Sequence, residues 1–109
     1  GKFDIARAGW AGDYKDPNSF LDLFISTSAL NGGNYTSAEY DELIEKASTM
    51  PGGEKRYQVL AQAEKLLMED MPIAPFYFYS QSNMIDLDKW GGWYTNVLDI
   101  HPTKDIYMK

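Results

Sequence analysis

Apolar and polar positions follow two different spacings in the first part of the 109-residue chain. Residues 3–8 alternate in part between apolar and polar side chains, which predicts a short strand. Residues 9–14 then read as a loop with two glycines near a tryptophan. Asp16-Pro17 follows as a predicted N-cap with proline at the first helical position. The helix after it would run through a stripe of apolar residues at helical spacing: Phe20, Leu21, Phe24 and Ile25.

Two longer helices are predicted in the middle of the chain. The first follows a turn at residues 31–34 and a capping box formed by Thr36 and Glu39. Its apolar positions are Tyr40, Leu43, Ile44 and Ala47. The run Met50-Pro51-Gly52-Gly53 ends it, and a second helix is expected from about Glu54 to Asp70. One face of that helix is expected to bury Tyr57, Leu60, Ala61, Leu67, Met68 and Met71.

The last third of the chain favours strands. Pro72 ends the preceding helix, and residues 73–79 then read as a buried, aromatic-rich strand with residues 81–86 as its neighbour. After a break at Gly91-Gly92, residues 106–108 are expected to form a last short strand. The order of elements indicates an α+β fold with about three helices and several short strands.

Composition narrows the classes of function. Hydrophobic residues make up 44% and charged residues 24%, as in an ordinary globular domain with one core. The net charge of −6 argues against a nucleic-acid partner, because phosphate binding needs a concentrated basic patch. No run of apolar residues approaches the roughly 20 that are needed to cross a bilayer.

Catalytic and metal-binding patterns are lacking in the sequence. There is no cysteine and a single histidine, His101, so neither a disulfide nor a zinc site can be assembled. Phosphate-binding and dinucleotide-binding glycine motifs and a serine nucleophile elbow are also missing. Asp13 with Asp16, and Asp86 with Asp88, fit caps and solvated turns better than acid–base pairs. We therefore expect no enzyme activity, no cofactor and no metal.

One segment carries a specific resemblance. Residues 6–21 read Ala-Arg-Ala-Gly-Trp-Ala-Gly-Asp-Tyr-Lys-Asp-Pro-Asn-Ser-Phe-Leu, which resembles the signature of the oligopeptide-binding proteins, solute-binding protein family 5. Gly12 departs from the pattern, since the family usually has alanine there. Further matches follow in the family's order and cover essentially the whole chain: Asn34-Tyr35, Tyr40-Asp41, Leu43-Ile44, Arg56, Ala63-Glu64, Pro72-Ile73-Ala74-Pro75, Tyr77, Gly92 and Ile106-Tyr107.

The resemblance implies a C-terminal part of a two-lobed, periplasmic-binding-protein-like fold of type II. Residues 1–94 would belong to the C-terminal peptide-binding lobe, and residues 95–109 would return to the other lobe. The implied partners are a peptide ligand and the membrane permease of an ABC importer. The implied location is extracytoplasmic, as a cell-surface lipoprotein or in the periplasm, although these residues include neither signal nor lipid anchor. As an isolated piece, the chain is expected to self-associate.

The resemblance also implies ligand-binding residues. Asp13 matches the aspartate that pairs with the α-amino group of the peptide. Backbone groups around Gly9, Trp10 and Ala11 match those that hydrogen-bond to the peptide main chain. Trp10 matches a tryptophan that lines a side-chain pocket, and Arg7 matches an arginine that helps to neutralise the C-terminus of the peptide in some members.

Each assignment has an alternative in the sequence itself. Trp10 fits a core position, Asp13 fits a turn residue, and Arg7 fits a charge on a strand surface or an internal ion pair. For the whole chain, the alternative is an autonomous aromatic-rich module that binds carbohydrate or cell wall through its 8 tyrosines and 3 tryptophans. That module would need its aromatic side chains on an exposed face. The spacing of Tyr40, Tyr57 and residues 76–79 predicts instead that they are buried.

Overall fold

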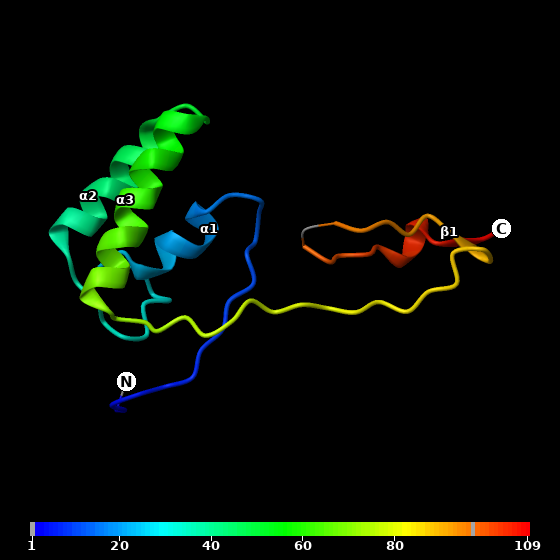
Figure 1. The fold of residues 1–109 in the computed structure, drawn as a ribbon, viewed down its shortest axis with the longest axis horizontal. Coiled ribbons are helices and arrows are strands. Elements are labelled where there is room, and N and C mark those ends of the chain that lie inside the picture. The colour runs from blue at the N-terminus through cyan, green and yellow to red at the C-terminus, as the bar shows by residue number, and fades with distance from the viewer. Residues whose placement is uncertain (1, 97) are drawn as a thin grey trace. The chain divides into compact units, whose positions relative to one another are not determined.

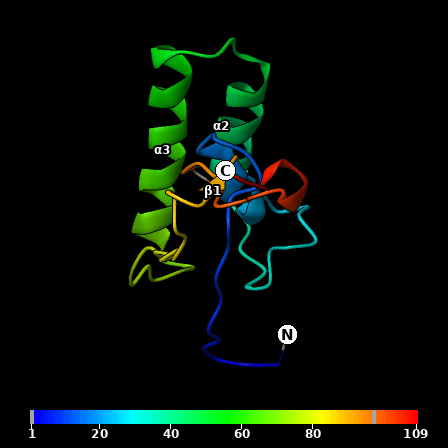
Figure 2. The ribbon, with the colours of Figure 1, turned by 90° about the vertical axis from the view of Figure 1, so that its right-hand side faces the viewer.

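The computed structural model describes residues 2–96 and 98–109, and the chain divides into two compact units, Gly1–Pro75 and Phe76–Lys109. Figures 1 and 2 show the helices and strands of each unit. The first unit contains α1 (Asn18–Leu21), the 3-10 helix η1 (Asp22–Phe24), α2 (Ala38–Thr49) and α3 (Glu54–Asp70). The second contains β1 (Trp90–Gly91), the 3-10 helix η2 (Thr103–Asp105) and β2 (Tyr107–Met108). The predicted mixture of three helices and short strands is confirmed in this outline.

Local signals in the sequence fix the ends of α2. The Oγ of Ser37 accepts a hydrogen bond from the backbone N–H of Tyr40 at 3.3 Å, so Ser37 is the N-cap. The predicted capping box of Thr36 and Glu39 was therefore wrong by one residue. At the other end Met50 is extended, the conformation that a following proline favours, and α2 stops at Thr49 as predicted.

The core of the first unit lies between α2 and α3, which form a helical hairpin (Figure 2). Tyr40, Ala47 and Ala63 are fully buried, and the two alanines let the helices approach closely. The hydroxyl of Tyr40 donates to the carbonyl of Leu21 at 2.6 Å, so the buried ring also holds α1 on the hairpin. Burial raises the pKa of Tyr40 well above its usual range. The core consists of Leu21, Tyr40, Ile44, Ala47, Val59, Leu60, Ala63 and Leu67.

The predicted core face of α3 was only partly right, although its bounds agree with the structure. Leu60 and Leu67 are buried, but Tyr57, Ala61 and Met71 are exposed. Val59 and Ala63 occupy the core in their place. The buried stripe is narrower than predicted and is rotated toward the side that carries Ala63, because α2 approaches α3 on that side.

Three predicted strands do not form. Residues 3–8, 73–79 and 81–86 are irregular or extended without strand pairing. Phe76 is 90% exposed and Phe78 is 100% exposed, so the prediction of a buried strand there was wrong. A strand exists only where a neighbouring strand accepts and donates its backbone hydrogen bonds. The sequence pattern of these segments indicates extended backbone but does not supply that neighbour.

The second unit is closed by one short antiparallel ladder. β1 pairs with β2 through Trp90 opposite Met108 and Gly91 opposite Tyr107, so the predicted last strand is confirmed for Tyr107–Met108. The ring of Tyr107 lies against the backbone of Gly91, where any side chain would collide with it. The pairing continues through a 2.8 Å bond from the N–H of Lys109 to the carbonyl of Lys89.

A polar cluster orders the segment between the two strands. The Nε2 of His101 lies 2.8 Å from the carboxylate of Asp99, and the imidazole stacks on Trp93 with ring centroids 4.7 Å apart. The amide of Asn83 donates to the same Asp99 oxygen at 2.7 Å. The hydrogen bond from His101 lowers the pKa of Asp99, and the bond from Asn83 adds to the effect. His101 therefore has a structural partner in this unit.

Two negative findings apply to residues 2–96 and 98–109. Within them, no helix combines the length and the apolar character that crossing a membrane would require. The same residues contain no group of three or more histidine, cysteine or acidic side chains that could hold a metal ion.

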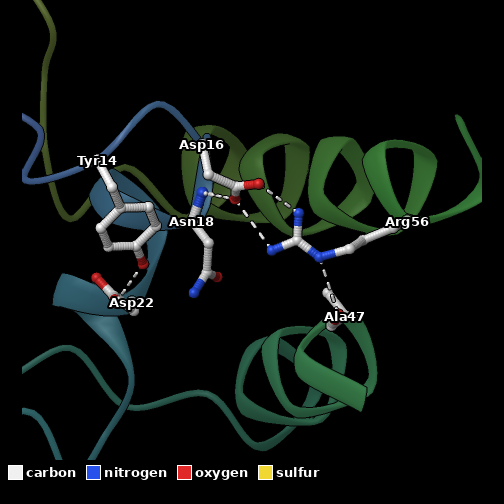
Figure 3. Close-up of polar contacts among 6 residues, drawn as sticks. All are labelled: Tyr14, Asp16, Asn18, Asp22, Ala47 and Arg56. Atoms are coloured by element: carbon white, nitrogen blue, oxygen red, sulfur yellow. Dashed lines mark hydrogen bonds and ion pairs between the residues drawn. The ribbon is translucent and has the colours of Figure 1, made fainter. Parts of the chain in front are cut away.

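An ion pair joins the segment before α1 to both long helices. Figure 3 shows the guanidinium of Arg56, on α3, between Asp16 and the carbonyl of Ala47. Its two terminal nitrogens lie 2.6 and 3.0 Å from the carboxylate oxygens of Asp16, and its Nε donates to the Ala47 carbonyl at 3.1 Å. The Arg56 and Asp16 side chains are only 13% and 20% exposed. This geometry uses the planar fork of arginine, which lysine cannot reproduce.

The ion pair should make the stability of the folded state depend on pH. The hydrogen bonds from Arg56 lower the pKa of Asp16 despite its partial burial, and the N–H of Asn18 lowers it further. The folded state therefore favours the carboxylate. The resulting stability is fully present above the unfolded pKa of 3.8 and is lost as the pH falls through the lower pKa of the folded state.

We expect Asp16→Asn to lower the free energy of unfolding by about 1.5–3 kcal/mol at pH 7, because it leaves a largely buried guanidinium without its counter-charge. The loss should shrink below pH 3.8, where Asp16 becomes protonated in the unfolded and then the folded state. Urea unfolding followed by far-ultraviolet circular dichroism measures both effects. Lys65→Ala, which breaks the exposed pair with Glu69, is the control and should cost less than about 0.5 kcal/mol. Equal effects of the two substitutions would contradict this account.

The end of α3 offers a stabilising change. Met71 has φ 53° and ψ 40°, a left-handed conformation that disfavours side chains with a Cβ, and 62% of it is exposed. We therefore expect Met71→Gly to stabilise the protein by about 0.5–1 kcal/mol. Ala61→Gly, at an exposed position inside the same helix, should destabilise it by about 1 kcal/mol. Thermal unfolding should show shifts of opposite sign, and a lower midpoint for Met71→Gly would contradict the prediction.

Candidate functional site

The loop at residues 9–17 leads into α1. The buried residue Ser19 holds the first half of this loop through two hydrogen bonds. Only 2% of Ser19 is exposed. Its Oγ accepts a hydrogen bond from the backbone N–H of Asp13 at 2.7 Å, and its carbonyl accepts one from the indole Nε1–H of Trp10 at 2.9 Å. The donors of the two bonds, Trp10 and Asp13, are three residues apart in the loop. They therefore fix the course of the chain from Trp10 to Asp13 against the start of α1.

Gly12 lets this part of the loop approach α1 closely. A Cβ at Gly12 would lie 3.0 Å from Cε2 and 3.1 Å from Cζ of Phe20, and 3.4 Å from Oγ of Ser19. An alanine here would therefore press on the ring of Phe20. Glycine in place of the expected alanine therefore lets the Phe20 ring lie against the loop backbone.

The second half of the loop is held by Asp16. Besides its ion pair with Arg56, Asp16 accepts a hydrogen bond from the N–H of Asn18 at 2.9 Å (Figure 3). The helix begins at Asn18 with Pro17 as its N-cap residue, so the predicted boundary was early by one residue. The hydroxyl of Tyr14 lies 3.4 Å from the carboxylate of Asp22. Both halves of the loop are thus fixed to helices rather than to each other.

Four of the residues expected to bind ligand lie on the Ser19-held part of the loop: Gly9, Trp10, Ala11 and Asp13. All four are exposed, and Trp10, at 37%, lies outside the core. Within the described residues, no backbone–backbone hydrogen bond uses the N–H or C=O groups of Gly9, Trp10 or Ala11. Arg7 is exposed and precedes the loop in a segment that was predicted to be a strand and is irregular.

The chemistry that this surface offers is non-covalent. Free main-chain groups can pair with an extended backbone, the Asp13 carboxylate can accept hydrogen bonds from a cation, and the indole of Trp10 can pack on an apolar side chain. The loop lines neither of two shallow hollows, of about 300 and 290 Å³, which lie at residues 50–55 and between α2 and α3. Within the described residues, the loop is therefore an exposed surface and does not line a hollow.

Two supporting residues were missed from the sequence. Ser19 stood inside the quoted signature, but a single serine before an apolar pair gives no sign of which loop groups it binds. Arg56 was noted as a match without a role. The sequence does show an arginine early in one predicted helix and an aspartate just before another. That the two form an ion pair depends on the tertiary packing of α1 against α3, which the sequence pattern does not give.

The chain resembles known proteins along its whole length, although no family model matches it. It is 37% identical over 109 residues to the periplasmic oligopeptide-binding protein OppA of Salmonella typhimurium, covering 100% of this chain and 19% of that protein. It is 36% identical over 108 residues to the periplasmic murein peptide-binding protein MppA of Escherichia coli, covering 99% of this chain and 20% of MppA. The dipeptide-binding protein DppE of Bacillus subtilis is 36% identical over 83 residues, which are 76% of this chain and 15% of DppE.

A solved structure agrees with these sequence relatives. The crystal structure of a peptide-binding protein of a peptide ABC transporter matches 60% of this chain and 30% of its own, with a TM-score of 0.54 and 43% sequence identity. The chain spans about one fifth of the length of the curated relatives OppA and MppA. On these findings, the chain belongs to the family of oligopeptide-binding proteins.

Proposed function

We propose that this chain is the C-terminal part of a two-lobed receptor that binds extended peptides and delivers them to the permease of an ABC importer. Residues 1–94 would contribute to the peptide-binding lobe, and residues 95–109 would return to the other lobe. The observation that carries the proposal is the exposed run from Gly9 to Asp13, which Ser19 holds in place. The names of the relatives support a peptide as the ligand. The remaining four fifths of such a receptor would supply the facing wall.

Each residue on the loop would read a feature that all peptides share, or one that distinguishes them. The carboxylate of Asp13 would pair with the α-amino group, and the main chain of Gly9, Trp10 and Ala11 would hydrogen-bond to the peptide backbone. The indole of Trp10 would form one wall of a side-chain pocket. Arg7 would help to neutralise the carboxylate of the peptide. A receptor for peptides of many sequences needs most the contacts to the α-amino group and to the peptide backbone, because all peptides share these groups.

The same relatives support the proposed location and the proposed non-enzymatic role. OppA and MppA are named as periplasmic, which supports an extracytoplasmic location, either in the periplasm or on the cell surface as a lipoprotein. All are named as binding proteins, which supports a receptor that needs no catalytic residue and no cofactor.

The alternative of a carbohydrate-binding or wall-binding module has one observation in its favour. Aromatic side chains expected to be buried are exposed instead, namely Tyr57 and residues 76–79, although Tyr40 is buried as predicted. Exposed aromatic rings can stack on sugars. The peptide receptor is still preferred, because relatives named for peptides match the full chain. Titration of the full-length receptor with peptides and with wall saccharides separates the two functions.

The peptide proposal predicts a specific effect at Asp13. In the full-length receptor, Asp13→Asn should weaken the binding of a peptide with a free α-amino group by at least about tenfold, because loss of a desolvated charge pair costs about 2–5 kcal/mol. The N-acetylated form of the same peptide is the control and should lose much less affinity. Isothermal titration calorimetry measures both. Unchanged affinity of Asp13→Asn for the free-amine peptide would remove Asp13 from the site.

Self-association of the isolated 109 residues is a second expectation. Phe76, Phe78 and Met84 are each at least 90% exposed on extended backbone without strand pairing, which offers apolar side chains and an unpaired strand-like edge to another copy. Light scattering at rising concentration should therefore report masses above 12.4 kDa. Replacing Phe76 and Phe78 with serine should lower the measured mass. A concentration-independent monomer would contradict this expectation.

A further inference from the structure

We propose that Ser19 is the positioning residue of the loop, and that it sets Asp13 and Trp10 through two different atoms. Its hydroxyl oxygen accepts from the N–H of Asp13, whereas its backbone carbonyl accepts from the indole of Trp10. This inference rests on the proposed function, in which these two residues read different parts of a peptide. Ser19 itself would not touch the ligand, because only 2% of it is exposed.

Ser19 can position the loop because it is itself held from the core. Its N–H donates to the carbonyl of Asp16 at 3.0 Å, and Asp16 is held by Arg56 on α3. Ser19 also lies in α1, and Leu21 at the end of this helix belongs to the buried cluster. A continuous path of an ion pair and hydrogen bonds therefore runs from α3 through Asp16 and Ser19 to the exposed loop.

The two bonds of Ser19 respond differently to substitution. Ser19→Ala removes the acceptor of the Asp13 N–H but keeps the backbone carbonyl that holds Trp10. Without that acceptor, the backbone at Asp13 loses its fixed position while the indole stays bound. The variant should therefore impair recognition of the α-amino group and leave the Trp10 pocket intact. A serine that served only the stability of the core would weaken all peptides alike.

The test uses the full-length receptor and one peptide in its free-amine and N-acetylated forms, with affinities measured by isothermal titration calorimetry. Ser19→Ala should weaken the free-amine peptide by about threefold to tenfold, the range that the net strength of one hydrogen bond implies. The N-acetylated peptide should change by less than about twofold. In an Asp13→Asn background, Ser19→Ala should cause no further loss, because the contact that it positions is already gone.

Two further variants make the test decisive. Ser48→Ala removes an exposed hydroxyl that bonds within α2, so it should change neither affinity. Ser19→Thr keeps a hydroxyl on the same Cβ and should preserve the preference for the free amine, even if Ser19→Ala proves too unstable to purify.

Three outcomes would overturn the inference: equal losses for both peptides, independent effects of Ser19→Ala and Asp13→Asn, or loss of the amine preference in a folded Ser19→Thr. A failure of the proposed function looks different. Asp13→Asn alone would then leave the free-amine peptide unaffected.

Discussion

The ion pair between Arg56 and Asp16 is the contact on which the arrangement of the loop depends. A four-residue helix such as α1 is far too short to be stable without tertiary contacts. Arg56 lies on a 17-residue helix in the core, and its guanidinium binds both the segment before α1 and the last turn of α2. Asp16 in turn holds Ser19, and Ser19 holds Trp10 and Asp13. Through the largely buried Asp16 and Ser19, the exposed residues Trp10 and Asp13 are thus connected to the buried helical hairpin.

The helices could be predicted from the sequence and the strands largely could not, for one physical reason. The ends of α2 and α3 are set by local features, such as the N-cap at Ser37 and the left-handed residue Met71 before Pro72. A helix also satisfies its own backbone hydrogen bonds, so its pattern is sufficient. Residues 73–79 have the apolar, aromatic character of a strand, but a strand needs a partner that their own sequence cannot specify. Among the described residues, only β1 and β2 find a partner strand, and each is the partner of the other.

The candidate site divides in the same way. Gly9, Trp10, Ala11 and Asp13 were predicted because a resemblance assigned them roles, and they lie together on one exposed loop. Ser19 and Gly12 determine how the loop packs on α1. They do so through contacts with other residues, and the sequence pattern does not indicate which residues these are. The ring of Phe20 against Gly12 and the hydroxyl of Ser19 at Asp13 become visible only once α1 is folded back on the loop.

A receptor for peptides of many sequences must combine a fixed main chain with broad specificity for side chains. To bind main-chain groups it must hold its own main chain still, because each residue ordered on binding would reduce affinity. To accept many side chains it must avoid a pocket shaped for one of them. In the proposed receptor, this loop would meet both needs by separating them. Its supporting groups are largely buried and charged or hydrogen-bonded, whereas the main-chain groups of Gly9, Trp10 and Ala11 make no backbone–backbone hydrogen bond within the described residues. The support for the loop therefore comes from Ser19, Asp16 and Arg56. In the proposed receptor, the main chain of Gly9 to Ala11 would bind the peptide backbone whatever its side chains, and the Trp10 indole would line a pocket for one of them.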